Sequence, residues 1–341
     1  MKRTGDLWRQ ICTFDNALSA YHKARKGKRF RIEVVEFEQE RELNLLKLVE
    51  NLKDLSYHAG RYKVFKIYEP KERVIMALPF RDRVAQHMIC NYIEPLYERR
   101  FYTHSYACRK GKGVHEASDT LQRWLYNLEV VQGKQIYALK CDIHHYFQSV
   151  DHEVLKAENR RYFKDKELLT ILDRVIDHNG VFPDGKGIPV GNLTSQLFAN
   201  VYLNVLDEFI KNDLRCKYYI RYMDDFVILS DSVEELKEVW SRLEEFLKDR
   251  LKLVLNPKTT IVCAKNGVDF VGYRHYNRTR KVRKGAMRRM RKLLKELEAG
   301  KIDKEQFEQS FQSRVASMEH ADTYHLIQGY KVEANRLLKT A

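Results

Sequence analysis

Long runs of apolar residues are missing from this sequence. No stretch of 18 apolar residues occurs among its 341 residues, and the opening MKRTGDLWRQ lacks the apolar centre of a signal peptide. A transmembrane helix needs about 20 mostly apolar residues, and a secretory signal needs an apolar segment near the N-terminus. We therefore expect no membrane partner and a cytoplasmic location.

Metal-binding cysteine pairs and phosphate-binding glycine motifs are missing as well. The six cysteines are scattered without a C-x-x-C pair, so we expect neither a zinc site nor a disulfide framework. The sequence contains no G-x-x-x-x-G-K-[ST] and no G-x-G-x-x-G. The P-loop and Rossmann folds therefore have no support.

Positive charge, in contrast, is abundant. The chain has 62 Lys and Arg residues against 47 Asp and Glu, which gives a net charge of +15. Such an excess favours a polyanionic partner, most simply nucleic acid. Because 44% of the residues are hydrophobic and 11% are aromatic, the protein has enough apolar side chains to form a globular core.

Hydrophobic periodicity predicts a mixture of helices and strands. The helices are expected over residues 40–55, 82–99, 192–211 and 232–250 and from 286 onward. The strands are expected over residues 135–147, 218–223, 226–230, 261–264 and 268–273, with two more within 61–80 around a loop at Glu69-Pro70. Since strands and helices do not alternate in a βαβ rhythm, the predicted fold class is α+β.

Two adjacent aspartates, Asp224 and Asp225, interrupt the apolar segment YIRYMDDFVILS (219–230). Asp is common in turns, but these flanking strands are too apolar for a surface ribbon, and a third carboxylate, Asp142, ends another apolar strand. Like charges at close range repel unless a cation neutralises them, and carboxylate oxygens suit Mg²⁺ or Mn²⁺. Two such ions would catalyse phosphoryl transfer, so the sequence predicts a nucleic-acid polymerase or nuclease.

The order of the motifs resembles that of reverse transcriptases. YMDD (222–225) resembles their catalytic box, and the motifs that accompany it in the same order are EPKERVIMALPFRDRVAQH (69–87), YACRKGKG (106–113), LKCDIHHYFQSVDHEVL (139–155), GIPVGNLTSQLFANVYL (187–203), LNPKTT (255–260) and VDFVGY (268–273). The resemblance covers roughly residues 5–340. It implies a right-hand polymerase fold with an N-terminal helical extension (1–56), interleaved catalytic fingers and palm (57–275) and a basic helical thumb (276–341).

The resemblance also assigns roles to individual residues. Asp142, Asp224 and Asp225 would be catalytic and would hold two Mg²⁺ ions, or Mn²⁺, with the carbonyl of Ile143 as a backbone ligand. Phe147 matches the aromatic ring that excludes a ribonucleotide 2′-hydroxyl. The other residues expected to bind the incoming dNTP are Lys71, Arg73, Val190, Gly191 and Lys258.

Contacts with the nucleic acid are expected mainly from the basic segment 274–292, which contains ten basic residues and no acidic one. Such contacts would hold duplex phosphates without reading sequence. Arg81 and Arg83 are equally well explained as template contacts or as part of a helix start. The residues expected to bind nucleic acid are Arg81, Arg83, Gly272, Tyr273, Arg280, Lys281, Arg283, Lys284, Arg288 and Arg289.

One segment suggests a particular kind of reverse transcriptase. Most bacterial relatives read Q-G-x-x-x-S-P where this chain reads Val190-Gly191-Asn192-Leu193-Thr194-Ser195-Gln196. An apolar residue before the glycine, with Ser-Gln at the end, resembles the enzymes of diversity-generating retroelements, which are encoded by bacteria or phages. That resemblance implies error-prone copying of a structured template RNA opposite adenine, an RNA/cDNA duplex as product, and a small oligomeric helical accessory protein as partner. The alternatives are a retron or abortive-infection enzyme in phage defence and a non-catalytic RNA-binding protein.

Overall fold

The computed structural model describes residues 3–68 and 72–340, so Lys71 and the loop predicted at Glu69-Pro70 lie outside the described residues. The chain divides into two compact units. Unit 1 comprises Met1–Thr103, Ile143–Arg215 and Arg242–Pro257, and unit 2 comprises His104–Asp142, Cys216–Ser241 and Lys258–Ala341. Within the described ranges, no helix combines the length and apolar character needed to span a membrane.

The N-terminal part of unit 1 is helical. Its helices are α1 (Trp8–Ile11), α2 (Phe14–Arg25), α3 (Ile32–Gln39), α4 (Arg41–Lys53) and α5 (Phe80–Glu98). The helix predicted over 40–55 is α4, which buries Leu45, Leu48 and Leu52 at intervals of three and four residues. The helix predicted over 82–99 is α5. Both predictions are confirmed.

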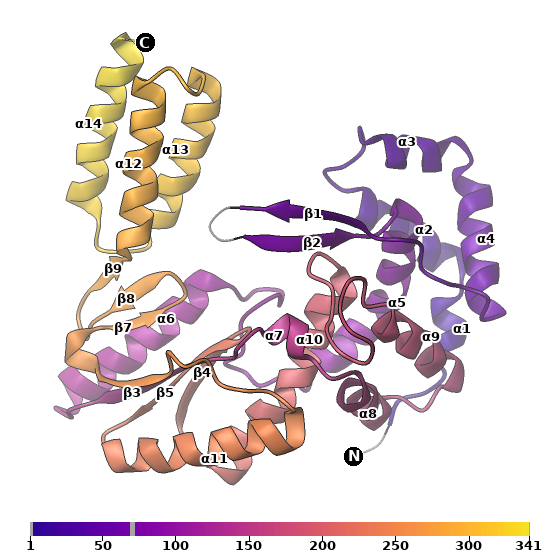
Figure 1. Cartoon of the computed structure of the whole chain (residues 1–341), viewed down its shortest axis with the longest axis horizontal. Helices are drawn as coiled ribbons and strands as arrows, with labels where there is room; N and C mark the ends of the chain where they lie inside the picture. Colours follow the sequence, from indigo (N-terminus) through magenta and orange to yellow (C-terminus); the bar gives the residue numbers. More distant parts are fainter. Residues whose placement is uncertain (1–2, 69–71, 341) are drawn as a thin grey trace. The chain divides into compact units, whose positions relative to one another are not determined.

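A two-stranded antiparallel hairpin, β1 (Lys63–Ile67) and β2 (Arg73–Ala77), belongs to the same unit (Figure 1). Every residue of β1 is exposed, whereas Met76 of β2 is fully buried. The two strands predicted within 61–80 are therefore present. Unit 1 is completed by α7 (Tyr146–Ser149), α8 (His152–Tyr162), α9 (Lys166–Asp177) and α10 (Leu193–Glu208), which continues as a π-helical segment, Phe209–Asp213.

Unit 2 contains a four-stranded antiparallel sheet in the order β4-β5-β3-β6. The strands are β3 (Tyr137–Asp142), β4 (Tyr218–Tyr222), β5 (Asp225–Ser230) and β6 (Thr260–Cys263). One face of the sheet packs against α6 (Val114–Leu125), which a π-helical segment, Tyr126–Val131, continues. The helix predicted over 232–250 is α11 (Val233–Leu251), whose residues are divided between the two units.

The strand predicted over 135–147 is shorter than expected, because β3 ends at Asp142. Left-handed backbone at His145, with φ of 46°, precedes α7 and breaks the extended conformation. The strand predicted over 268–273 is confirmed only for Val268–Phe270. Val271 and Gly272 have φ of 41° and 91°, and a two-residue turn with positive φ reverses the chain.

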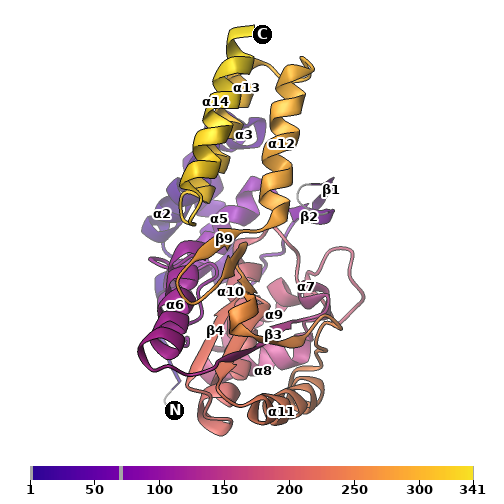
Figure 2. The same ribbon diagram turned by 90° about the vertical axis from the view of Figure 1, so that its left-hand side faces the viewer.

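The chain after β6 and a short 3₁₀ segment, Ala264–Asn266, therefore forms a three-stranded sheet of β7 (Val268–Phe270), β8 (Tyr273–His275) and β9 (Arg280–Val282). This sheet leads into three helices, α12 (Lys284–Glu298), α13 (Lys304–Met318) and α14 (Tyr324–Thr340). The three helices run side by side in both views (Figure 2). The helical tail predicted from residue 286 onward is thus confirmed.

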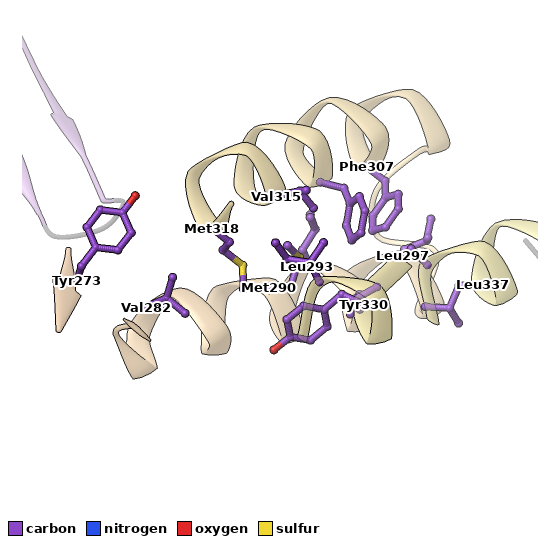
Figure 3. Packing of buried hydrophobic residues seen from close by; sticks show 14 residues of the cluster. Tyr273, Val282, Met290, Leu293, Leu297, Phe307, Val315, Met318, Tyr330 and Leu337 are labelled. Atoms are coloured by element: carbon purple, nitrogen blue, oxygen red, sulfur yellow. The ribbon is translucent and has the colours of Figure 1, made fainter. Parts of the chain in front are cut away.

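The three terminal helices share a hydrophobic core. Met290, Leu293 and Leu297 of α12 recur at intervals of three and four residues, and all three are buried. They face Phe307 and Val315 of α13 (Figure 3). Burying one such side chain contributes roughly 1.5–3 kcal/mol, so the apolar stripe, and not the intrinsic propensity of the basic α12 sequence, holds the bundle together.

Candidate active site

The turn between β4 and β5 consists of Met223 and Asp224, and Asp225 is the first residue of β5. The two adjacent aspartates are therefore placed differently, one in the turn and one on the strand. Met223 has φ of 55°, a left-handed conformation that costs roughly 1–2 kcal/mol for a residue other than glycine. Strain of this kind is concentrated at functional sites.

Asp142, the last residue of β3, lies directly opposite Asp225 in the antiparallel pairing of β3 and β5. Side chains of directly opposed residues lie on one face of a sheet, with Cβ atoms about 4.5–5.5 Å apart. Like charges in such a pair destabilise the sheet. The fold therefore brings together two carboxylates that are about 80 residues apart in the sequence, at an electrostatic cost.

The surroundings of Asp225 favour its uncharged form. Its side chain is 27% exposed, and no hydrogen-bond donor of the described residues reaches its buried Oδ1 atom. The pKa of Asp225 is raised to about 7, mainly by burial; the charges of Lys140 and Arg283 act to lower it, and those of Asp142 and Asp224 act to raise it. A buried carboxylate with an unpaired oxygen is stabilised in its charged form by a nearby cation, so it is a suitable cation ligand.

Lys140 is a site residue that the sequence did not single out. Its Nζ atom lies 3.9 Å from Oδ1 of Asp225, too far for a hydrogen bond but close enough for charge attraction. The signal was present in the sequence, because alternate residues of a strand share a face and Lys140 stands two positions before Asp142. Lys140 therefore offsets part of the negative charge of the aspartates.

The donor set fits a hard divalent cation. All three side chains supply carboxylate oxygens, and one buried oxygen of Asp225 lacks a hydrogen-bond partner in the described part of the chain; Mg²⁺ and Mn²⁺ prefer oxygen ligands. Across residues 3–68 and 72–340, however, no three His, Cys, Asp or Glu side chains already adopt the geometry of a metal site. The chemistry of the donors, and not a preformed cage, supports metal binding. The exposed His144 and His145 are adjacent in the chain but contribute no such group.

In unit 1, two of the predicted nucleotide-binding residues contact the β1–β2 hairpin. The carbonyl of Val190 accepts a hydrogen bond from the backbone N–H of Met76 in β2, at 3.0 Å. Gly191 has φ of 118°, and a Cβ atom there would lie 3.1 Å from Cγ2 of Ile75 and 3.3 Å from the carbonyl of Met76. The glycine is therefore required by both the backbone conformation and the close approach of β2.

The other predicted nucleotide-binding residues have varied environments. Phe147 is half-buried in α7, and its carbonyl accepts a hydrogen bond from the N–H of Ile188. Arg73 of β2 and Lys258 are exposed, and Lys71 lies outside the described residues. The nucleotide contacts of these residues stay predictions. Ile143, the predicted backbone ligand of a metal ion, is buried and forms a β-bridge with Leu255; its metal contact stays a prediction as well.

Arg81 and Arg83 have internal partners near the start of α5. Arg81 donates hydrogen bonds to Asp82 and to the carbonyl of His58, at 2.7 Å in both cases. Arg83 donates to the carbonyl of Leu78 at 2.9 Å and also pairs with Glu33. These contacts correspond to the structural alternative that the sequence left open, and a contact with template phosphates stays a prediction.

Of the residues in unit 2 that were predicted to bind nucleic acid, one is buried and several are exposed. Tyr273 is buried, donates a hydrogen bond to the carbonyl of Ser317 and belongs to the core of the helical bundle. Its ring therefore packs in this core, and its contact with nucleic acid stays a prediction. Gly272, in contrast, is exposed in the β7–β8 turn. The exposed basic residues are Lys281, Lys284, Arg288 and Arg289.

Arg280 and Arg283, from the same basic segment, have acidic neighbours. Arg283 lies 3.7 Å from Asp269. Arg280 forms an ion pair with Asp119 at 2.5 Å, its side chain is only 16% exposed, and it donates a hydrogen bond to Ser118. Arg280 thus has internal partners, and its contact with nucleic acid phosphates stays a prediction.

The hydroxyl of Ser118 connects Arg280 to a buried histidine. Ser118 Oγ lies 2.8 Å from Nε2 of His275, and Nδ1 of His275 lies 3.2 Å from the carbonyl of Val268. Since the carbonyl can only accept, Nδ1 carries the proton and Nε2 accepts from Ser118. Burial lowers the pKa of His275 to about 4, so this network contains a neutral histidine.

Comparison with known proteins agrees with this geometry. Residues 66–275, more than half of the chain, match the family described as reverse transcriptase (RNA-dependent DNA polymerase). The chain is 26% identical over 262 residues to protein YkfC of Escherichia coli strain K12, with 64% of this chain and 68% of that protein covered. It is 22% identical over 304 residues to the group II intron-encoded protein LtrA of Lactococcus lactis subsp. cremoris, with 68% of this chain and 49% of that protein covered.

Among solved structures, telomerase from Candida albicans is similar in fold. The TM-score is 0.52 at 12% sequence identity, and the match covers 90% of this chain and 60% of that one. The chain thus spans about half of LtrA and three-fifths of the telomerase chain. The fold is the α+β right-hand polymerase fold, and the chain belongs to the reverse transcriptase family of RNA-dependent DNA polymerases.

Proposed function

We propose that this protein copies a template RNA into cDNA, as a reverse transcriptase of the diversity-generating retroelement type. The observation that carries the polymerase function is the placement of Asp142 opposite Asp225, with Asp224 in the adjoining turn. Three carboxylates concentrated at one end of an antiparallel sheet are costly to the fold, and a site that handles cations and phosphates accounts for that cost.

Asp142, Asp224 and Asp225 would hold two Mg²⁺ or Mn²⁺ ions, with the carbonyl of Ile143 as an additional ligand. Such ions would supply positive charge to stabilise a triphosphate and to increase the acidity of a primer 3′-hydroxyl. Lys140 would limit the negative charge of the carboxylate cluster. In this way the chain binds the reacting groups and orients them, which is the main requirement for phosphoryl transfer.

The residues proposed to bind the incoming nucleotide would act in two ways, through charge and through shape. Lys71, Arg73 and Lys258 would bind the triphosphate and the leaving pyrophosphate, where charge-assisted hydrogen bonds are strong. Phe147 would exclude a ribonucleotide because its ring collides with a 2′-hydroxyl. Gly191 would present its backbone to the nascent pair, since it carries no side chain.

The retroelement type is supported by Val190 and by the Ser195-Gln196 pair that follows it. Valine offers no donor or acceptor to the templating base, so a correct pair gains little over an incorrect one, and errors opposite adenine are the expected result. The proposed partners are a structured template RNA, the RNA/cDNA duplex, dNTPs and a small oligomeric helical accessory protein. The proposed location is the cytoplasm of a bacterium.

The proposed domain organisation follows the functional divisions of the family. Residues 1–56 would form an N-terminal extension, residues 57–275 interleaved fingers and palm, and residues 276–341 a thumb. The thumb would contact duplex phosphates through Lys281, Arg283, Lys284, Arg288 and Arg289. Such contacts carry no sequence information. The affinity for nucleic acid should therefore fall with increasing salt concentration to the same extent for every template sequence.

The test is primer extension on an RNA template, followed by sequencing of the cDNA. Wild type should extend the primer, and the double variant Asp224→Ala/Asp225→Ala should not, although its circular dichroism is unchanged. Asp231→Ala is a matched control, because Asp231 also adjoins β5 but is 49% exposed and pairs with Lys134. RNA binding without extension by wild type would support the non-catalytic alternative and refute the polymerase. Active wild type with no excess of errors at adenine would favour the retron or abortive-infection alternative.

A further inference from the structure

Arg221 is a fully buried arginine one residue before the YMDD segment. Its exposed fraction is 0%, and it is among the largest fully buried side chains of the described residues. Burying a guanidinium is costly unless hydrogen bonds and charges compensate it. A sheet that needed only packing at this position would be served by an apolar residue.

The backbone of Arg221 is held on both sides. In the sheet it lies opposite Phe226 of β5. On its other side, its N–H donates to the carbonyl of His104 at 2.9 Å, and its carbonyl accepts from the N–H of Tyr106 at 3.0 Å. These contacts fix the backbone of Arg221 and therefore the direction of its Cα–Cβ bond.

The side chain of Arg221 lies on the face opposite to the carboxylates. Asp225 is paired with Tyr222 and opposed to Asp142 on one face, and Arg221, one residue before Tyr222, points to the other face. From there, Nη1 donates a hydrogen bond to the carbonyl of Met223 at 3.1 Å. Met223 is the turn residue with φ of 55°.

These contacts connect a buried charge to a strained turn. The left-handed conformation of Met223 is unfavourable for a side chain with a Cβ atom and persists only when the surroundings hold it. A charge-assisted hydrogen bond to the carbonyl of the same residue opposes relaxation of the turn. Relaxation would move Asp224, the next residue.

We propose that Arg221 is a positioning residue: from the face opposite to the carboxylates, its guanidinium fixes the Met223 carbonyl and thereby holds the turn that orients Asp224. It touches neither the substrate nor the metals. The inference rests on the proposed polymerase function for its kinetic consequence, but its structural consequence is independent of activity. A purely structural role would stabilise the sheet without affecting the geometry of Asp224.

The kinetic test uses Arg221→Lys, which keeps the charge but loses the planar fork. We expect kcat to fall about tenfold, the equivalent of about 1.4 kcal/mol, and the Mg²⁺ concentration for half-maximal rate to rise, with KM for primer-template unchanged. Arg174→Lys is the matched control, because Arg174 also donates to a backbone carbonyl, that of Leu55, in unit 1. It should change stability without changing the Mg²⁺ dependence.

A double-mutant cycle with Met223→Gly separates positioning from packing. Glycine adopts positive φ without strain, so Arg221→Lys should cost clearly less than tenfold in kcat in the Met223→Gly background. An equal loss in both backgrounds would overturn the proposal. So would an activity loss that only follows the folded fraction.

Hydrogen exchange provides the readout that does not need catalysis. In Arg221→Lys, a peptide covering the turn at 222–225 should exchange faster than in wild type, while peptides from α6 should not change. Unchanged exchange of the turn peptide refutes the positioning role, whether or not the protein is active. If wild type makes no cDNA while the exchange result is as expected, the proposed polymerase function fails and the role of Arg221 in holding the turn stands.

Discussion

The carboxylate of Asp225 should destabilise the metal-free protein, and Asp225→Asn should therefore stabilise it while removing activity. The pKa of Asp225 is raised from 3.8 to about 7. Between these two values the folded protein retains a proton that the unfolded chain has lost, so the free energy of unfolding falls as the pH rises. Above pH 7 the full cost of the charged side chain is present.

The size of the effect follows from the same values. A shift of one pKa unit corresponds to about 1.36 kcal/mol, and the difference between 3.8 and about 7 gives roughly 4 kcal/mol as an upper value. Asparagine keeps the shape of the side chain and carries no charge. We expect Asp225→Asn to raise the free energy of unfolding by about 1–4 kcal/mol at pH 8, and by far less near pH 4.

The measurement is urea unfolding followed by tryptophan fluorescence at pH 4 and at pH 8, with EDTA and then with Mg²⁺. Magnesium should stabilise wild type at pH 8 because it binds the folded state, and it should stabilise Asp225→Asn less. Asp231→Asn is the control, because the hydrogen bond and charge of Lys134 lower the pKa of Asp231. That variant should not be stabilised.

Two results would refute this reasoning. If Asp225→Asn is less stable than wild type at pH 8 in EDTA, burial does not disfavour the charged form. If Mg²⁺ stabilises both proteins equally, Asp225 is not a ligand. The expected combination, a more stable protein without activity, is the usual relation between a strained functional site and the fold that carries it.

Three further predictions concern single side chains. Phe147→Ala should incorporate ribonucleotides in primer extension because it lacks the excluding ring, and unchanged discrimination would make Phe147 a packing residue only. Val190→Gln should lower errors opposite adenine by a few-fold up to about tenfold, since one hydrogen bond contributes about 0.5–1.5 kcal/mol; sequencing cDNA of both proteins from one template tests this, and an unchanged adenine error rate would place the cause elsewhere. The neutral state of His275, whose pKa is lowered from 6.5 to about 4, stabilises the fold above pH 6.5, and this contribution of about 3 kcal/mol should be lost as the pH falls toward 4. The stability of His275→Gln should not show this loss between pH 6.5 and pH 4. An identical loss of stability in both proteins would contradict the neutral state of His275.

Local patterns in the sequence determined much of the fold. The apolar runs on both sides of Met223 and Asp224 predicted the β4–β5 hairpin, and leucines at helical spacing predicted α4. These patterns are readable because a strand buried on both faces needs a continuous apolar run, whereas a helix buried on one face repeats its apolar residues every three to four positions. The order of the motifs around YMDD likewise indicated the family before any contact was known.

Short-range backbone conformation was less predictable. The strand expected over 268–273 is a hairpin because Val271 adopts φ of 41°, which a β-branched residue rarely does. Propensity predicted an extended residue at this position. Pairing of β7 with β8 in unit 2 overrides that propensity, and the one local signal was Gly272, since a glycine within a strand pattern often marks a turn or bulge.

The chemistry of the site was decided by tertiary structure. The sequence supplied the three aspartates, but only the register of β3 against β5 places Asp142 opposite Asp225, and only the folded state provides the burial that is the main cause of the raised Asp225 pKa. Likewise, Arg221 reads as a basic residue near a catalytic motif until its guanidinium is found beneath the turn, hydrogen-bonded to the carbonyl of Met223. The sequence shows which chemical groups are available. Strand register, burial and side-chain direction depend on contacts between segments far apart in the chain, and the pKa values and hydrogen bonds of a site depend on those contacts.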